Sequence, residues 1–348
     1  MSPLTVPQPK VAMHQQRVII LIPVFNDWVA VTKLLGMLDE EMEKNQYDNV
    51  SVLLVDDGSV LPVPEETFAF RPRALVGVQV LALRRNLGHQ RAIAIGLTHI
   101  AEKIPCRVVV VMDGDGEDAP ADVPKLLARF EELNGTRVIF AERARRTEKI
   151  SFRIFYKLYK GAHRLLTGEG VRVGNFSALP QKLLMRLVVV SDLWNHYAAA
   201  VFKARLPQDM IPLSRGYRLA GESRMNFVSL VIHGLSAMSV YGDRIGVRLL
   251  AATGGAVFVL LVALLSLLAA RFVFHMEISK WIAYAVAGVL IILSQMLAVA
   301  LVFVFIVLAG RDSSSFLPLR DYHYYIGEIY SIWPGDTADM SGAPLAAA

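Results

Sequence analysis

The stretch RVVVVMDGDGEDAP, residues 107–120, decides the fold. It begins as an unbroken apolar, β-branched run, which is typical of a strand buried on both faces of a parallel sheet. Four similar runs are RVIILIP (17–23), VSVLLVD (50–56), VQVLAL (78–83) and RVIFA (137–141). Helical periodicity fills residues 28–44, 90–103 and 121–133. This alternation predicts a doubly wound α/β fold with a mostly parallel sheet, whose ligands bind beyond the carboxyl ends of the strands.

Acidic residues, rather than glycine-rich phosphate loops, follow these strands. The first strand ends in PVFND, the second in DDGS (Asp56 to Ser59) and the fourth in DGDGED (Asp113 to Asp118). No strand is followed by G-x-G-x-x-G or by a Walker loop, which disfavours a dinucleotide oxidoreductase and a P-loop NTPase. The ligand edge of the predicted sheet is therefore lined by carboxylates.

The acids after the fourth strand suit a metal ion. Asp113 and Asp115 are two residues apart, so in an extended backbone they project to the same side, with Glu117 at the next matching step. Such oxygen ligands favour Mg²⁺ or Mn²⁺, which would neutralise the charge that develops on a leaving diphosphate. A solvated acidic turn is the alternative for this pattern taken alone.

The acids after the second strand also have two interpretations. Asp56, Asp57, Gly58 and Ser59 are all turn formers, so DDGS fits a tight turn that leads into a helix cap. Two adjacent acids at the ligand edge can equally accept hydrogen bonds from a nucleobase N–H and from ribose hydroxyls. The position and order of the motif favour nucleotide binding.

Two long uncharged runs near the C-terminus predict membrane spans. Residues 249–270 and 281–309 each reach the ~20 residues that cross a bilayer. The link RFVFHMEISK is too short for a domain, so a helical hairpin is expected. Two buried core helices are disfavoured, because helices of this length in a core normally keep a polar stripe.

The flanking charges and the first residues predict how the hairpin is oriented. Arg244 and Arg248 precede the first span, and Arg311 and Arg320 follow the second, which favours cytosolic flanks, although the connecting loop also contains Arg271 and Lys280. Residues 1–16 contain no apolar segment typical of a signal peptide, which favours a cytosolic N-terminal domain. We therefore expect a multi-pass protein of the cell (inner) membrane with both termini cytoplasmic.

Composition narrows the class of partners. The net charge is +5 and the pI about 9.3, but the basic residues are scattered, so no nucleic acid is expected. An anionic membrane surface or a phosphorylated substrate explains them better. The single cysteine, Cys106, fits a buried thiol in a reducing compartment.

Six motifs in order resemble one family. They are PVFND, DDGS, RRNLGHQRAIAIGL, DGDGEDAP, an arginine after the fifth strand, and R-x-x-R-x-x-G-x-S-R (215–224). From about Arg17 through the second span the chain resembles the family 2 glycosyltransferases of GT-A fold, in their dolichol-phosphate mannosyltransferase and polyisoprenyl-phosphate glycosyltransferase branch. The resemblance implies an N-terminal tail (1–16), a GT-A catalytic domain with a Rossmann-like, mostly parallel sheet (17–221), an interfacial helix region (222–248), the transmembrane hairpin (249–309) and a cytosolic tail (310–348).

The resemblance also implies roles for individual residues. Asp57, beside Asp56, looks like the nucleobase and ribose contact, with Pro23 and Asn26 shaping the pocket. The metal and diphosphate motif falls on Asp113, Asp115 and Glu117, although the family's usual Asp-Ala-Asp-Leu-Gln is changed here at positions 114, 116 and 117. Phosphate-gripping positions fall on Arg143 and Arg153, and the later basic motif supplies Arg215, Arg218, Ser223 and Arg224. His89 is interpreted as a structural hydrogen-bonding residue.

Two segments with mixed basic and aromatic residues are candidates for helices in the membrane interface. They are residues 151–166 and 222–238, and an amphipathic helix packed on the sheet is the alternative for each. The resemblance, in which two such helices join the catalytic domain to the bilayer, favours the interfacial position. It leaves the oligomeric state open and is compatible with a homo-oligomer.

The expected reaction is an inverting, metal-dependent transfer of a sugar from a nucleotide diphosphate sugar to a polyisoprenyl phosphate. A phosphate monoester has a second pKa of about 6, so this acceptor is mostly a dianion and needs no strong general base. A lipid or glycan hydroxyl acceptor would need one, with candidates Glu117, Asp118, Asp192 and His196. A membrane scaffold with a relict nucleotide pocket is a third hypothesis.

Overall fold

The computed structural model describes residues 17–143, 161, 163–168, 173–214, 216–220, 234–273, 275, 279–312 and 316–334. The chain divides into two compact units. The first contains residues 1–147, 172–240 and 316–348, and the second contains residues 148–171 and 241–315.

The first unit is built on one mixed sheet of eight strands in the order β7-β5-β6-β4-β1-β2-β3-β8. Parallel pairing joins β4 (Val108–Val111), β1 (Val18–Val24), β2 (Val50–Asp56) and β3 (Leu75–Leu83). β6 (Val173–Pro180) runs antiparallel to both β4 and β5 (Val138–Arg143), and β7 (Gln208–Leu213) runs parallel to β5. The predicted doubly wound, mostly parallel sheet is confirmed.

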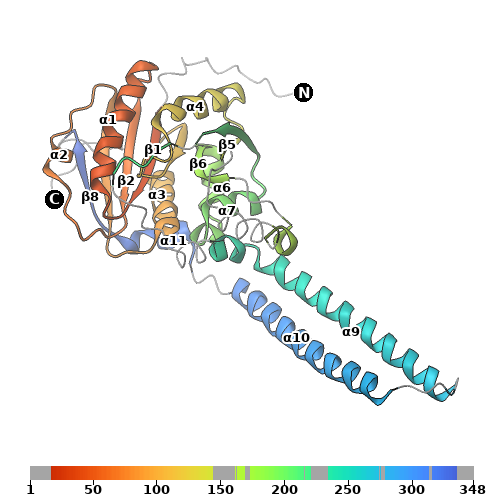
Figure 1. The fold of residues 1–348 in the computed structure, drawn as a ribbon. Coiled ribbons are helices and arrows are strands. Elements are labelled where there is room, and N and C mark those ends of the chain that lie inside the picture. Colours follow the sequence, from red (N-terminus) through yellow and green to blue (C-terminus); the bar gives the residue numbers. More distant parts are fainter. Residues whose placement is uncertain are drawn as a thin grey trace, which may run out of the picture. The chain divides into compact units, whose positions relative to one another are not determined.

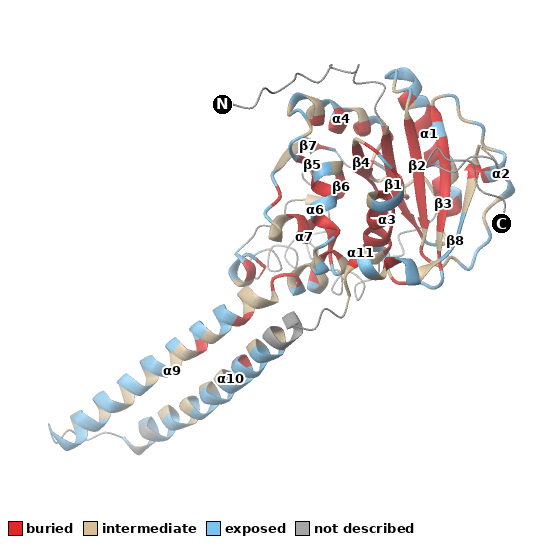
Figure 2. Cartoon of the chain, turned by 180° about the vertical axis from the view of Figure 1, so that it is seen from behind, coloured by how far each residue is buried: buried red, intermediate tan, exposed pale blue. Residues whose placement is uncertain are grey.

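Helices cover both faces of this sheet, as Figure 1 shows. α1 (Trp28–Lys44) and α4 (Val123–Glu132) pack on one face, and α3 (His89–Lys103), α6 (Gln181–Leu187) and α7 (Tyr197–Lys203) on the other. Alternate strand residues serve the two cores: Ile20 contributes to the first and Ile19 to the second. The buried residues therefore concentrate in the strands and on the inner helix faces (Figure 2). Short elements are α2 (Glu65–Phe68), η2 (Pro120–Asp122) and η3 (Ser191–Trp194).

The segment after the second apolar helix corrects an expectation. The sequence predicts a cytosolic tail from residue 310, but residues 318–333 belong to the first unit. They form α11 (Pro318–Asp321), η4 (Tyr322–Tyr325) and β8 (Ile326–Trp333), and β8 pairs antiparallel with β3. Ile332 of β8 is buried in the sheet core, and Tyr330 and Trp333 pack against the same core.

The second unit is dominated by two long apolar helices. α9 (Gly242–Phe272) starts seven residues before the predicted span, and α10 covers Lys280–Asp312. Both contain a segment long and apolar enough to cross a membrane: Gly242–Phe272 in α9 and Tyr284–Val307 in α10, with mean hydropathies of 2.4 and 2.9. Only 6% of the most apolar window is buried in each, which is the opposite of a core helix in a soluble domain. These two helices could therefore form a transmembrane hairpin.

Candidate active site

The acidic motifs meet at the carboxyl ends of the central strands. β1 lies between β2 and β4, so the order of the sheet reverses beside β1, which creates a crevice at the strand ends. Asn26 and Asp27 follow β1, Asp56 ends β2, and Asp113 follows β4 after one residue. Three distant segments of sequence therefore place their acids at one edge.

The loop of residues 113–118, here called the acidic loop, is held by its own carboxylates. The backbone N–H of Asp113 donates to Asp118 Oδ2, and that of Glu117 donates to Asp115 Oδ1, both at 2.9 Å. Gly116 has φ +88°, and a Cβ there would lie 2.3 Å from Cγ of Leu219. The glycine that replaces the family's usual leucine is therefore required by the backbone and by close packing on residues 216–219.

Arg218 links the acidic loop to the end of β1. Its Nη1 donates to Asp115 Oδ2 at 3.0 Å, its Nη2 donates to Asp27 Oδ2, and its Nε donates to the carbonyl of Ala220 at 3.0 Å. The Arg218 side chain is 19% exposed, so these ion pairs are partly shielded from water. Arg218, predicted from the later basic motif, thus lies at the acidic loop.

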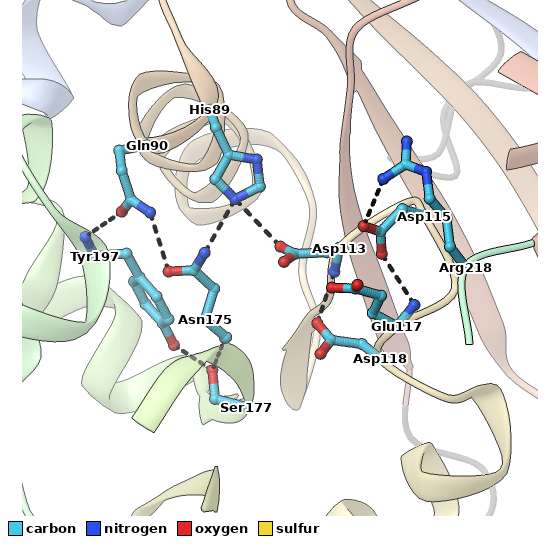
Figure 3. Close-up of polar contacts among 10 residues, drawn as sticks. All are labelled: His89, Gln90, Asp113, Asp115, Glu117, Asp118, Asn175, Ser177, Tyr197 and Arg218. Atoms are coloured by element: carbon cyan, nitrogen blue, oxygen red, sulfur yellow. Dashed lines mark hydrogen bonds and ion pairs between the residues drawn. The ribbon is translucent and has the colours of Figure 1, made fainter. Parts of the chain in front are cut away.

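A second polar network reaches Asp113 from the opposite side. His89 Nε2 lies 3.2 Å from Asp113 Oδ1 and 3.0 Å from Nδ2 of Asn175 (Figure 3). Asn175 accepts from Gln90 Nε2 at 3.1 Å, and Gln90 in turn accepts from the backbone N–H of Tyr197 at 2.8 Å. Partial burial lowers the pKa of His89, but the Asp113 carboxylate more than offsets it, so the pKa is raised. The network anchors the Asp113 side chain to α3, β6 and α7.

Asp113 and Asp115 point in different directions in this conformation. Asp113 faces His89, and Asp115 faces Arg218 (Figure 3). Among the residues that the structure describes, no three His, Cys, Asp or Glu side chains converge closely enough to hold a metal ion. The set of Asp113, Asp115 and Glu117 nevertheless consists of carboxylates within five residues of one loop, which is the donor chemistry that Mg²⁺ and Mn²⁺ require.

The DDGS loop is organised by hydrogen bonds to its acids. The Asp57 carboxylate is buried and accepts from the backbone N–H groups of Leu87 and Gly88, at 2.7 and 2.8 Å. Burial raises the pKa of Asp57, and these two N–H groups oppose that rise. Asp56, which is only partly buried, accepts from the N–H of Ser59 at 2.9 Å. Asp57 therefore joins the β2 and β3 loops.

Replacing Asp57 with alanine is expected to reduce stability markedly. The change leaves two amides without their acceptor, at about 1–3 kcal/mol for each buried group, so a loss of about 2–6 kcal/mol is expected. Thermal unfolding of the purified full chain followed by circular dichroism measures it. Asp56→Ala is the matched neighbour and should lose less, because it gives up one partly exposed hydrogen bond. Equal midpoints for the two variants would contradict this role of Asp57.

The remaining predicted residues are placed as follows. Pro23 lies inside β1 and is buried, paired with Val55 of β2. Asn26 Oδ1 accepts from the N–H groups of Val60 and Leu61 at 2.8 and 2.9 Å, so it orders the loop after β2. Arg143 ends β5, which runs in the same direction as β4 because β6 is antiparallel to both. Arg153, Arg215, Ser223 and Arg224 lie outside the described residues, as does most of each predicted interfacial helix.

Three residues of the site were not assigned from sequence. Asp27 belongs to the PVFND motif, which could have marked it as a residue of the site. In the structure it pairs with Arg218. Asn175 comes from β6, a strand that the sequence analysis did not identify. His89 was interpreted as structural, and its contact with Asp113 places that structural role at the site itself.

Comparison with known proteins finds relatives that are named as glycosyltransferases. Residues 19–188 match the model of Glycosyl transferase family 2. The uncharacterized glycosyltransferase YkcC of Bacillus subtilis is 24% identical over 231 residues, covering 63% of this chain and 68% of that protein. Undecaprenyl-phosphate 4-deoxy-4-formamido-L-arabinose transferase of Klebsiella pneumoniae is 23% identical over 224 residues, covering 62% of this chain and 64% of that protein.

Solved structures resemble the fold at lower identity. Glucosyl-3-phosphoglycerate synthase from Mycobacterium tuberculosis, in complex with Mn²⁺, uridine-diphosphate-glucose and phosphoglyceric acid, is 15% identical with a TM-score of 0.48. The match covers 71% of this chain and 86% of that one.

The family match identifies a glycosyltransferase domain, and the mixed, mostly parallel sheet has the GT-A arrangement. The chain carries a Glycosyl transferase family 2 domain over residues 19–188, and the protein is a transferase enzyme. The recognition made from the ordered motifs is confirmed.

Proposed function

We propose that the protein transfers a sugar, with inversion, from a nucleotide diphosphate sugar to a polyisoprenyl phosphate. The observation that carries the proposal is the acidic loop at the reversal point of the sheet, where Asp113 follows β4 at the same strand ends as the acids after β1 and β2. The polyprenyl phosphate acceptor is supported by the undecaprenyl-phosphate transferases among the relatives.

A divalent cation, Mg²⁺ or Mn²⁺, would be held by Asp113, Asp115 and Glu117. When bound, it supplies positive charge to the leaving nucleoside diphosphate. The structure supports this donor set through its chemistry and its accessibility, since Asp113 and Asp115 side chains are 24% and 21% exposed. Both carboxylates already have cationic or polar partners, so Arg218 and His89 hold them in place before ligand binding.

The described residues suit a reaction without a strong general base. His89 and Asn175 orient Asp113, while Arg218 fixes the direction of Asp115. Asp56 keeps a partly exposed carboxylate at the end of β2, where it can accept from the donor's base or ribose. The dianionic acceptor then needs chiefly alignment with the anomeric carbon, which the site must supply.

The connectivity of the sheet supports the proposed membrane topology. Seven strands come from residues before the hairpin, whereas β8 comes from residues after it and pairs with β3. Strands of one folded sheet lie on one side of a membrane, so both flanks of a spanning hairpin must also lie there. We place this side in the cytosol, where nucleotide sugars and the donor site would meet.

The test is transfer by the purified full chain in detergent. Radiolabelled nucleotide sugars are incubated with undecaprenyl phosphate and Mn²⁺ or Mg²⁺, and organic extraction separates the lipid product. We expect labelled polyprenyl phosphate sugar from at least one donor, with release of nucleoside diphosphate and loss of product in EDTA. Label found only in a glycolipid or glycan, with added membranes, would replace the proposed acceptor by a hydroxyl.

Arg153→Ala is expected to impair acceptor use. The lost guanidinium removes a paired contact to phosphate, so the KM for undecaprenyl phosphate should rise about tenfold or more, with the donor KM little changed. Steady-state assays with each substrate varied in turn measure both constants. Arg186→Ala, in exposed surroundings on α6, is the control and should behave as the parent. An unchanged acceptor KM and kcat in Arg153→Ala would remove this residue from the site.

A further inference from the structure

A cavity of about 400 Å³ lies between the first turns of α9 and the last turns of α10. Both helices belong to the second unit, and no residue of the acidic loop lines the cavity. Val247 of α9 and Val304 and Val307 of α10 supply apolar walls. A Cβ on Gly246 would lie 3.0 Å from Val304 Cγ2, so the two helices pack closely at this point.

Two arginines one helical turn apart also line this cavity. The Arg244 guanidinium lies 5.4 Å from the centroid of the Tyr241 ring, which is a cation–π contact. Arg248 donates from Nη1 to the carbonyl of Leu165 at 2.6 Å, which ties a neighbouring helical segment to α9. A guanidinium has five N–H donors, so this anchoring leaves donors for an anion.

The charge of the lining favours an anion only modestly. Asp243 lines the cavity together with the two arginines, so these three side chains carry a net charge of +1. Arg244 and Asp243 also interact with protein groups, and a ligand would have to join these interactions. A ligand of this cavity would therefore need both a negative charge and apolar surface.

The position of the cavity along α9 points to the boundary of a bilayer. Arg248 is the last charged residue before the uncharged run of residues 249–270, and the next charged residue is Arg271. A ligand in the cavity would meet cationic groups at one end and apolar helix surface that continues along the predicted span. Basic pockets between transmembrane helices bind the headgroups of anionic lipids.

We propose that this cavity binds one anionic phospholipid, with its phosphate at Arg244 and Arg248, its glycerol region against Val304 and Val307, and its acyl chains along the uncharged run that begins at residue 249. The apolar walls disfavour free phosphate, and the net positive charge disfavours zwitterionic lipids. The site is independent of the proposed reaction, because no residue of the acidic loop contributes to it. Anionic lipid would stabilise the packing of α9 on α10.

The test is lipid binding to the full chain in neutral detergent, measured by native mass spectrometry with phosphatidylglycerol and phosphatidylcholine. We expect preferential binding of phosphatidylglycerol, because each arginine near a membrane surface contributes about fivefold in affinity for anionic lipid. R244Q/R248Q should therefore bind about 25-fold more weakly, and D243N about fivefold more tightly. R271Q, at the other end of α9, is the matched control and should behave as the parent.

Two further variants separate the cavity from general charge. V247W fills the space without changing charge and should weaken phosphatidylglycerol binding, whereas R244K/R248K keeps the charge and should retain most of it. V247W and R244K/R248K still test the proposal if R244Q/R248Q fails to fold, as judged by its elution profile. The proposal is overturned by equal binding of the two lipids, by equal losses in R271Q and R244Q/R248Q, by unaffected binding in V247W, or by displacement of phosphatidylglycerol with equimolar undecaprenyl phosphate.

Discussion

Asp115→Asn is expected to lower kcat/KM for sugar transfer by about a thousandfold, because it removes charge that stabilises the leaving diphosphate. The amide keeps the shape of the carboxylate and can still accept from Arg218, so the fold should survive. Asp113→Asn should behave similarly, since it alters the other aspartate of the acidic loop and its contact with His89. Initial rates with labelled donor measure the loss.

A second readout and a matched control separate catalysis from folding. Thermal shift with nucleoside diphosphate and Mn²⁺ should show stabilisation of the parent that is absent in both variants. Asp48→Ala is the control. This exposed acid precedes β2, at the opposite end of that strand from Asp56. Normal turnover in Asp115→Asn, or cation-dependent nucleotide binding equal to the parent, would rule out the metal assignment.

A chain that ends at Tyr325 is expected to lose the fold of the first unit. Without β8 the edge of β3 is unpaired, and exposed strand edges promote aggregation. The loss also removes Ile332, which is 3% exposed, and burial of such a side chain alone contributes about 2–5 kcal/mol. Size-exclusion profiles and limited proteolysis of the detergent-solubilised protein report the outcome. A chain that ends at Pro334 retains β8 and is the length control.

Single substitutions on β8 refine this test. Ile332→Ala should lower the unfolding midpoint, whereas Ile329→Ala, on the same strand but 41% exposed, should change it little. A soluble, protease-resistant chain ending at Tyr325, with transfer activity, would show that β8 is dispensable for the fold. Because β8 pairs with β3, the expected cytosolic tail from residue 310 does not describe residues 318–333.

Much of the core architecture could be predicted because it depends on local patterns. The runs that became β1, β2, β4 and β5 are apolar on both faces, which few contexts other than a parallel sheet tolerate. The 17 residues of α1 were predicted with both bounds. β6 and β7 were not identified, because their pairing joins segments far apart in sequence, and propensity reports little on such pairing.

The candidate site was only partly predictable. Residue type and spacing indicated that Asp113 and Asp115 follow a buried strand, and the structure places them at the predicted edge. Spacing did not reveal that their side chains diverge toward His89 and Arg218. It also did not show that the Asp57 carboxylate accepts hydrogen bonds from the N–H groups of Leu87 and Gly88, because those amides follow a different strand.

The class of fold, the acidic residues at the strand ends and the two apolar helices could all be predicted from the sequence. Each of these depends on patterns within one segment: hydrophobic periodicity, strand-end acids and uncharged length. Only the tertiary structure decided that β8 returns to the sheet, that Arg218 bridges Asp27 and Asp115, and that two arginines border a cavity between α9 and α10. Those features depend on which distant segments become neighbours, and that is set by packing and burial over the whole unit.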